Sequence, residues 1–237
     1  LSENTRFNAG GLLTLGSNSD APGGTAQVGS MPAGSSISGE VIYQRYMSGE
    51  GRIYRYISSP VENATVASLM DDFPVTGTFE DPSSGPGINS TAPSFYRYDE
   101  SQGTLLEGWQ PYPVLGLASE NMLEPGKGYA AFIRNGTGAT IWDVVGPLNQ
   151  GDISLPVNFT PNGAPSNGWN LVGNPYACTI DWDVTGAGGW IKQNISPIIS
   201  LRDNGVGGGG TFLYWDGDNS YHDIPNGQVA SGQSFWV

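Results

Sequence analysis

Residues 52–60 read RIYRYISSP, and residues 168–175 read GWNLVGNP. Both stretches are rich in the aromatic and β-branched side chains that favour strands. Both end in a proline, which has no N–H to donate to a strand ladder and therefore stops the strand. The same strand-and-stop signal in two distant places indicates that one structural unit occurs twice.

Other parts of the chain match in the same order. Their offsets, like that between the two prolines, lie between 106 and 117 residues. Four ordered matches predict an internal duplication rather than chance similarity. The further matching blocks are 39–43 with 151–155, 94–99 with 211–216, and 125–129 with 231–235.

The composition favours an all-β fold. The chain has 237 residues with 36 Gly, 17 Pro and 11% aromatic residues, which is typical of many short strands joined by tight turns. The nearest helical pattern is 62–73, about two turns that Pro74 would stop. We expect two tandem antiparallel β-sandwich-like repeats, at 39–147 and 151–237, with residues 1–38 as an N-terminal β extension that is the tail of a preceding region.

The sequence at the end of each repeat predicts how its last strands pair. In the first copy, 129–134 and 139–145 flank an Asn-Gly turn and are expected to form a hairpin. The second copy supplies only 234–237. We therefore expect a truncated second repeat whose last strand lacks a neighbour, supplied by other domains of the same chain or by neighbouring subunits.

The charge balance excludes several partners. The net charge of −13 repels a phosphate backbone, so no nucleic acid is expected. Lys127 and Lys192 are the only lysines, and no run of 18 apolar residues occurs, so no membrane insertion is expected either.

The sequence offers little for catalysis, and we expect no enzyme. His222 is the only histidine, and no Gly-x-Ser-x-Gly elbow is present. Residues 205–210 satisfy a Gly-x-Gly-x-x-Gly pattern, but a strand-like stretch follows them where a dinucleotide site needs a helix.

Two non-catalytic sites are considered. Asp216, Asp218 and Ser220 alternate, with Asp223 beyond, which fits either a plain Asp-Gly hairpin or the hard oxygen ligands of a calcium loop. The seven tryptophans either fill thin cores or stack on sugar rings. Trp109 and Trp190 lie outside the repeated strand blocks and are the candidates for a carbohydrate-binding surface.

Several motifs together resemble a known family. These are GWNLVGNPY at 168–176, IDW at 180–182, GQSFWV at 232–237 and RYISSPV at 55–61. They are similar to late-chain modules of large surface proteins exported by the type IX secretion system of Bacteroidota. The resemblance implies an extracellular or cell-surface location and a structural or adhesive role, in an adhesin or filament subunit. A carbohydrate-binding module is the alternative.

Overall fold

A computed structural model describes residues 3–10, 13–21, 23–49, 52–88, 90–134, 138–186, 189–204, 210–217 and 223–237. Throughout these ranges the chain is all-β, as expected, and none of their helices is long and apolar enough to cross a membrane. The 62–73 pattern yields a single 3₁₀ turn, η1 (Val66–Leu69), before Pro74. Similar short turns are η2 (Ala118–Glu120) and η3 (Pro225–Gly227).

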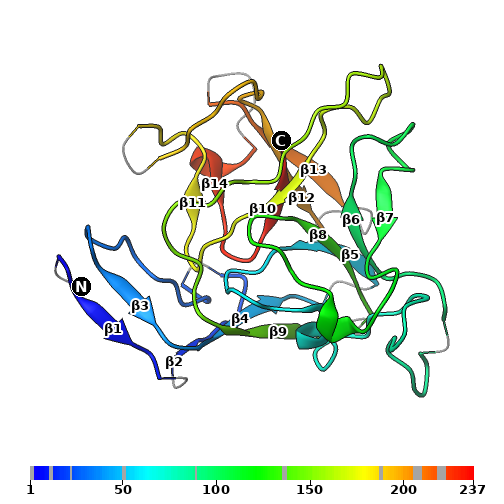
Figure 1. The fold of residues 1–237 in the computed structure, drawn as a ribbon, viewed down its shortest axis with the longest axis horizontal. Coiled ribbons are helices and arrows are strands. Elements are labelled where there is room, and N and C mark those ends of the chain that lie inside the picture. Colours follow the sequence, from blue (N-terminus) through cyan, green and yellow to red (C-terminus); the bar gives the residue numbers. More distant parts are fainter. Residues whose placement is uncertain are drawn as a thin grey trace.

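The two repeats each form a four-stranded antiparallel sheet, and the two sheets have the same strand order (Figure 1). The first sheet has the order β5-β8-β6-β7, with β5 (Ile53–Ile57), β8 (Tyr129–Ile133), β6 (Phe95–Tyr98) and β7 (Trp109–Pro111). The second has the order β10-β15-β12-β13, with β10 (Leu171–Gly173), β15 (Ser234–Trp236), β12 (Ile199–Asp203) and β13 (Thr211–Trp215).

The pairing register confirms the duplication. Ile57 pairs with Tyr129 in the first sheet, and Val172 pairs with Phe235 in the second. Pro60 and Pro175 each lie three residues beyond that first-strand residue, so they occupy equivalent positions.

Two of the four block matches are wrong. The first equates 94–99 with 211–216, but the strand equivalent to β6 is β12. Tyr96 pairs with Ala130 of β8, and Ser200 pairs with Trp236 of β15. The 211–215 strand, β13, instead takes the place of β7. Strands β6 and β13 are both rich in aromatic residues, whereas β12, the counterpart of β6, has none, and this explains the incorrect match.

Other pairings also differ from expectation. Strand β9 (Thr140–Gly146) is not the hairpin partner of β8; it pairs along its whole length with β4 (Val41–Met47). Residues 151–155, matched with the start of β4, form no strand, since no described strand lies beside them as β9 lies beside β4. Strand β15 pairs with both β10 and β12, so the expectation of a last strand without neighbours is wrong.

The N-terminal residues add short strands to this framework. Strand β2 (Leu13–Leu15) pairs in parallel with β4, and β1 (Arg6–Asn8) pairs in parallel with β3 (Ser36–Ser38). A small antiparallel pair, β11 (Ile180–Asp181) with β14 (Gln228–Val229), completes the second repeat.

The repeats interlock through their closing turns. Ile57 of β5 forms a bridge with Gln233, and its counterpart Val172 of β10 forms a bridge with Lys127. Gln233 and Lys127 are themselves equivalent, because each lies two residues before the aromatic residue that pairs with the first strand. The closing turn of each repeat therefore pairs with the first strand of the other repeat, and a pseudo-two-fold axis relates the two contacts.

The hydrogen bonds repeat this relationship one residue further along. The Ser58 N–H donates to the Gly232 carbonyl at 3.1 Å, and the Gly173 N–H donates to the Gly126 carbonyl at 2.9 Å. Both donors and both acceptors are equivalent pairs. The two repeats therefore form one interlocked unit rather than two independent domains.

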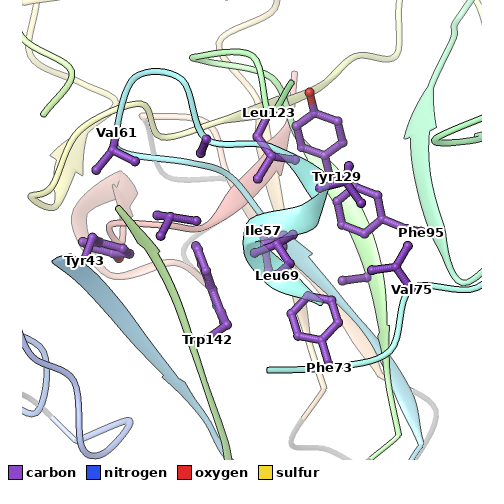
Figure 2. Close-up of a cluster of buried hydrophobic side chains, with 14 of the residues drawn as sticks. Tyr43, Ile57, Val61, Leu69, Phe73, Val75, Phe95, Leu123, Tyr129 and Trp142 are labelled. Atoms are coloured by element: carbon purple, nitrogen blue, oxygen red, sulfur yellow. The ribbon is translucent and has the colours of Figure 1, made fainter. Parts of the chain in front are cut away.

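Each repeat has its own hydrophobic core. In the first, Tyr43 and Trp142 lie on one side of Ile57 and Leu69, with Phe95 and Tyr129 on the other (Figure 2). The second core includes Val172, Trp182, Ile199 and Phe235.

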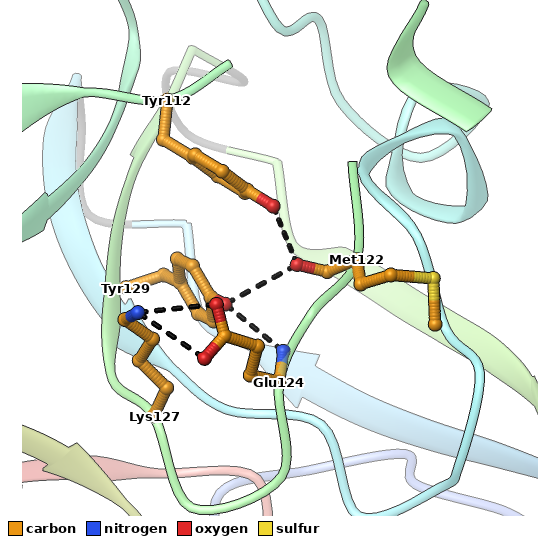
Figure 3. Close-up of polar contacts among 5 residues, drawn as sticks. All are labelled: Tyr112, Met122, Glu124, Lys127 and Tyr129. Carbon is orange, nitrogen blue, oxygen red and sulfur yellow. Dashed lines mark hydrogen bonds and ion pairs between the residues drawn. The ribbon is translucent and has the colours of Figure 1, made fainter. Parts of the chain in front are cut away.

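Tyrosine hydroxyls anchor the segment before the first closing turn. The Tyr112 hydroxyl donates to the Met122 carbonyl at 2.7 Å (Figure 3). The Tyr129 hydroxyl accepts the Glu124 N–H at 3.0 Å and donates to the same Met122 carbonyl at 3.3 Å. Lys127 Nζ lies 3.1 Å from Glu124 Oε1 across the turn. These contacts fix the turn that pairs with β10.

Candidate functional site

The outer face of the first sheet is aromatic. Directly paired residues lie on the same face of a sheet. Tyr54 pairs with Phe132, Tyr56 with Ala130, Ala130 also with Tyr96, and Tyr98 with Trp109. The opposite face, which carries Ile57, Tyr129 and Phe95, packs in the first core. Alternation along β5 and β6 thus separates the core aromatics from an aromatic outer face.

This outer face is hollow at its centre, because Ala130 is the small residue among large ones. The resulting cavity has a volume of about 340 Å³. We call it the aromatic hollow. It is lined by Tyr54, Tyr56, Tyr96, Leu106, Trp109, Ala130 and Arg202.

The second repeat fills the equivalent place. Ala130 and Trp236 are counterparts, since each pairs with the first and the second strand of its sheet. The Trp236 indole reaches the first repeat, where its centroid lies 4.7 Å from that of Tyr98 and 5.6 Å from that of Trp109, both edge to face. Trp236 packs beneath two aromatic residues of the first repeat, and Arg202 is the residue of the second repeat that lines the hollow.

The tyrosines of the hollow are fixed polar groups. The Tyr96 hydroxyl donates to the Pro93 carbonyl at 2.9 Å. Burial, with smaller contributions from Tyr96, raises the pKa of Tyr54 to about 12. Burial also raises the pKa of Tyr56. The hydroxyls of Tyr54 and Tyr56 therefore stay neutral near pH 7, where they can donate and accept hydrogen bonds.

A second, smaller cavity adjoins the hollow. Its volume is about 80 Å³, and Tyr56 and Arg202 line both cavities. We call it the arginine cavity, because Arg45 and Arg55 also line it. The remaining lining residues are Asp20, Tyr46, Met47, Ile57, Trp142, Asn204, Gly232 and Gln233.

The two predicted tryptophans have separate environments. Trp109 lies half-buried in the wall of the aromatic hollow, packed against Tyr56 with centroids 5.7 Å apart. Trp190, also half-buried, packs against Trp182 at 4.9 Å, and its indole N–H donates to the Asp181 carbonyl. Trp190 lines neither cavity. The two rings form no shared platform.

The predicted calcium ligands lie partly outside the described residues, since Asp218 and Ser220 are not described. The Asp223 carboxylate accepts the Tyr214 N–H at 3.1 Å, and the Asp223 N–H donates to the Tyr214 carbonyl. Asp216 is half-buried at the end of β13. No group of three metal-ligating side chains occurs within the described ranges. Calcium binding at this turn stays a prediction.

Sequence reasoning missed most of the residues that line the hollow. Tyr54 and Tyr56 alternate along β5, a visible signal that both lie on one face, and Ala130 is a small residue in an aromatic strand. Arg202 gave no such signal, because it reaches the hollow from the other repeat.

Comparisons with known proteins identify no relative. No family model, no curated protein and no solved structure matches the chain.

Proposed function

We propose that this chain is a non-catalytic adhesive module of a secreted or cell-surface protein, and that it binds a saccharide in the aromatic hollow. The observation that carries the proposal is the hollow itself. Trp109 and three tyrosines surround Ala130 on one sheet face. The surface location rests on the resemblance of the repeat motifs to exported surface proteins.

The chemistry of the lining suits a sugar. The apolar C–H face of a pyranose stacks on aromatic rings, while its hydroxyls need donors and acceptors close by. Trp109 and the tyrosine rings supply the first, and the neutral hydroxyls of Tyr54 and Tyr56 supply the second. A volume of about 340 Å³ is at the lower end of the size of small-ligand pockets.

The test is a binding screen against a glycan array, followed by titration with the best saccharide. We expect Trp109→Ala to weaken binding at least about 10-fold, the order expected for loss of one aromatic stacking contact. Trp169→Ala is the matched control, because Trp169 is 42% exposed and lines neither cavity. Its binding should equal that of the unmodified chain.

A second variant distinguishes loss of the binding site from loss of the fold. Trp109 also packs against Tyr56, Tyr98 and Trp236, so its loss lowers stability as well. Ala130→Leu instead fills the hollow without removing an existing contact. Because Ala130 is only 2% exposed, the larger side chain also costs about 1–3 kcal/mol of stability, so binding is measured at a temperature where thermal denaturation shows the variant folded, and there we expect it to abolish binding. Saccharide binding that tolerates both Trp109→Ala and Ala130→Leu would refute the site.

A further inference from the structure

The arginine cavity departs from the charge of the rest of the chain. The protein carries only nine Lys and Arg residues and a net charge of −13. Yet Arg45, Arg55 and Arg202 line this one small cavity, with Asp20 as the carboxylate among its lining residues. In an acidic protein, three guanidinium groups around one cavity point to an anionic group as the ligand.

The head group of Arg202 is held in place. Its Nε donates to Asn204 Oδ1 at 2.9 Å, and the Asn204 amide in turn donates to the Tyr54 carbonyl at 2.8 Å. The guanidinium carbon lies 5.9 Å from the Tyr56 ring centre and 5.8 Å from that of Phe212. A guanidinium oriented before the ligand arrives loses less entropy on binding a carboxylate or sulfate.

The other two arginines are placed from different elements. Arg55, on β5, donates to the Ser48 carbonyl at 2.9 Å. The Ser48 N–H donates to Asp20 Oδ2 at 3.2 Å, so Asp20 is engaged with the backbone of the same segment. Arg45 lies on β4. The cavity is therefore built jointly by β4, β5 and the second repeat.

The aromatic hollow and the arginine cavity share Tyr56 and Arg202. Arg55 lies on the opposite face of β5 from Tyr56, and β5 is an edge strand, so the two cavities adjoin around this edge. A substituent of a sugar ring in the hollow that reaches past Tyr56 and Arg202 would meet the arginines. We infer that the ligand is an anionic saccharide, with its ring in the aromatic hollow and its carboxylate or sulfate group in the arginine cavity. This inference rests on the proposed function and narrows its ligand to one chemical class.

A single-stranded nucleic acid also combines flat rings with negative charge. The observations favour the saccharide. A nucleic acid carries a phosphate on every nucleotide and needs an extended basic groove, whereas the net charge of −13 would repel a longer phosphate backbone. The arginines form one compact cavity rather than a track.

The experiment compares four probes by titration calorimetry at 0.1 M salt. These are oligogalacturonate, which carries carboxylates, a sulfated dextran oligosaccharide, a neutral dextran oligosaccharide and a single-stranded oligonucleotide. We expect one of the two charged saccharides to bind at least about 10-fold more tightly than the neutral one, since charge-assisted hydrogen bonds are roughly twice as strong as neutral ones. The carboxylate and sulfate arms identify which anion is recognised.

Variants separate the two parts of the site. Arg202→Gln and Arg45→Gln should each weaken binding of the charged saccharide about 10-fold or more. Arg45→Gln, at a residue that lines the arginine cavity and not the aromatic hollow, should leave the weak binding of the neutral saccharide unchanged. Arg52→Gln is the matched control, because Arg52 is exposed, lines neither cavity and should not change affinity.

The outcomes are distinguishable. Equal affinity for charged and neutral saccharides, unaffected by Arg202→Gln and Arg45→Gln, would overturn the anionic ligand and leave the proposed function intact. Failure of every saccharide to bind, in this experiment and on the array, would remove both. Preferential binding of the oligonucleotide would overturn the saccharide assignment.

Discussion

Ser58 and Gly173 are counterparts in the two repeats, and they face each other so closely that a Cβ on Gly173 would lie 2.2 Å from the Ser58 Cβ. Gly128 and Ser234 show the same relationship, with 2.9 Å between the Ser234 Cβ and a Cβ built on Gly128. A residue meets its own equivalent only at a two-fold axis. At both places one of the two copies is glycine, because two side chains would not fit.

The first prediction tests this axis. Gly173→Ala places a methyl group against Ser58 and 2.8 Å from the Lys127 carbonyl. Overpacking of a buried contact costs about 1–3 kcal/mol, which lowers the melting temperature of a chain of this size by about 3–10 °C. Thermal denaturation measures the shift.

The control exchanges the two residues. In the double variant Ser58→Gly with Gly173→Ser, the side chain moves to the equivalent position across the axis. We expect it to recover more than half of the stability that Gly173→Ser alone loses. A double variant no more stable than Gly173→Ser would argue against the pseudo-symmetry.

The second prediction concerns Asp72. Its Oδ2 accepts the Asp143 N–H at 2.7 Å. Burial, together with the charges of Asp143 and Asp71, raises the pKa of Asp72 to about 6, although that hydrogen bond lowers it. Because the unfolded pKa is about 3.9, the folded state binds more protons between about pH 4 and pH 6, and this group's contribution to stability falls as the pH rises through that window.

Asp72→Asn removes the buried charge and keeps an oxygen acceptor. We therefore expect the variant to melt at a higher temperature than the unmodified chain at pH 7, with the difference disappearing at pH 4 and below. Asp152→Asn, at an exposed position whose charge does not act on Asp72, is the matched control. A gain of the same size at both pH values would contradict the assigned pKa.

The third prediction concerns Glu100, a carboxylate that links the two repeats. Its side chain is buried, and it accepts hydrogen bonds from Thr160 Oγ1 at 2.6 Å and from the N–H groups of Thr160 and Gly168 at 3.0 Å each. Burial alone would raise the pKa of Glu100, but these hydrogen bonds outweigh it and hold the pKa below its usual value.

Glu100→Gln replaces one acceptor oxygen with an amide that faces donors. Removing a partner from such a buried network costs about 1–3 kcal/mol. We expect a lower melting temperature at pH 7. Because the folded pKa is lowered, the advantage of the carboxylate is present above the unfolded pKa, about pH 4.3, and is lost as the pH falls through the folded pKa. Glu107→Gln, at an exposed position of the same loop, should show no such pH-dependent difference.

The parts of the fold that were predictable are those with local signals. A few consecutive residues are enough to predict where the strands end, at Pro60 and Pro175, and where glycine turns precede Tyr129 and Phe235. The structure places the members of each pair at equivalent positions in the two repeats. Long-range pairing has no such signal. The Asn-Gly turn at 135–136 suggested a local hairpin, but β9 pairs with β4, which lies nearly a hundred residues earlier.

The candidate site divides in the same way. Trp109 was predicted as a site residue because it lies outside the blocks matched in the sequence, although the structure places it in β7, the counterpart of β13. The alternation of Tyr54 and Tyr56 along β5 was a further signal. Arg202 contributes to the hollow only because the repeats interlock. Its equivalent in the first repeat is Tyr98, so the repeat alignment itself gives no reason to expect an arginine there.

The last prediction concerns Trp236 at the end of the second repeat. The sequence suggested a final strand that lacks a neighbour, yet Trp236 is only 8% exposed and lies between β10 and β12. Its indole packs against three aromatic side chains of the first repeat, Tyr56, Tyr98 and Trp109.

We expect Trp236→Ala to lower the free energy of unfolding by about 3–5 kcal/mol, the usual cost of removing a buried tryptophan. Because Tyr98 and Trp109 lose their packing partner, the variant should also bind saccharide less tightly than the unmodified chain at a temperature where both are folded. Trp169→Ala is again the control, since Trp169 contacts Trp236 only at 6.4 Å between centroids and is 42% exposed. Equal melting temperatures for Trp236→Ala and Trp169→Ala would mean that Trp236 does not join the two repeats.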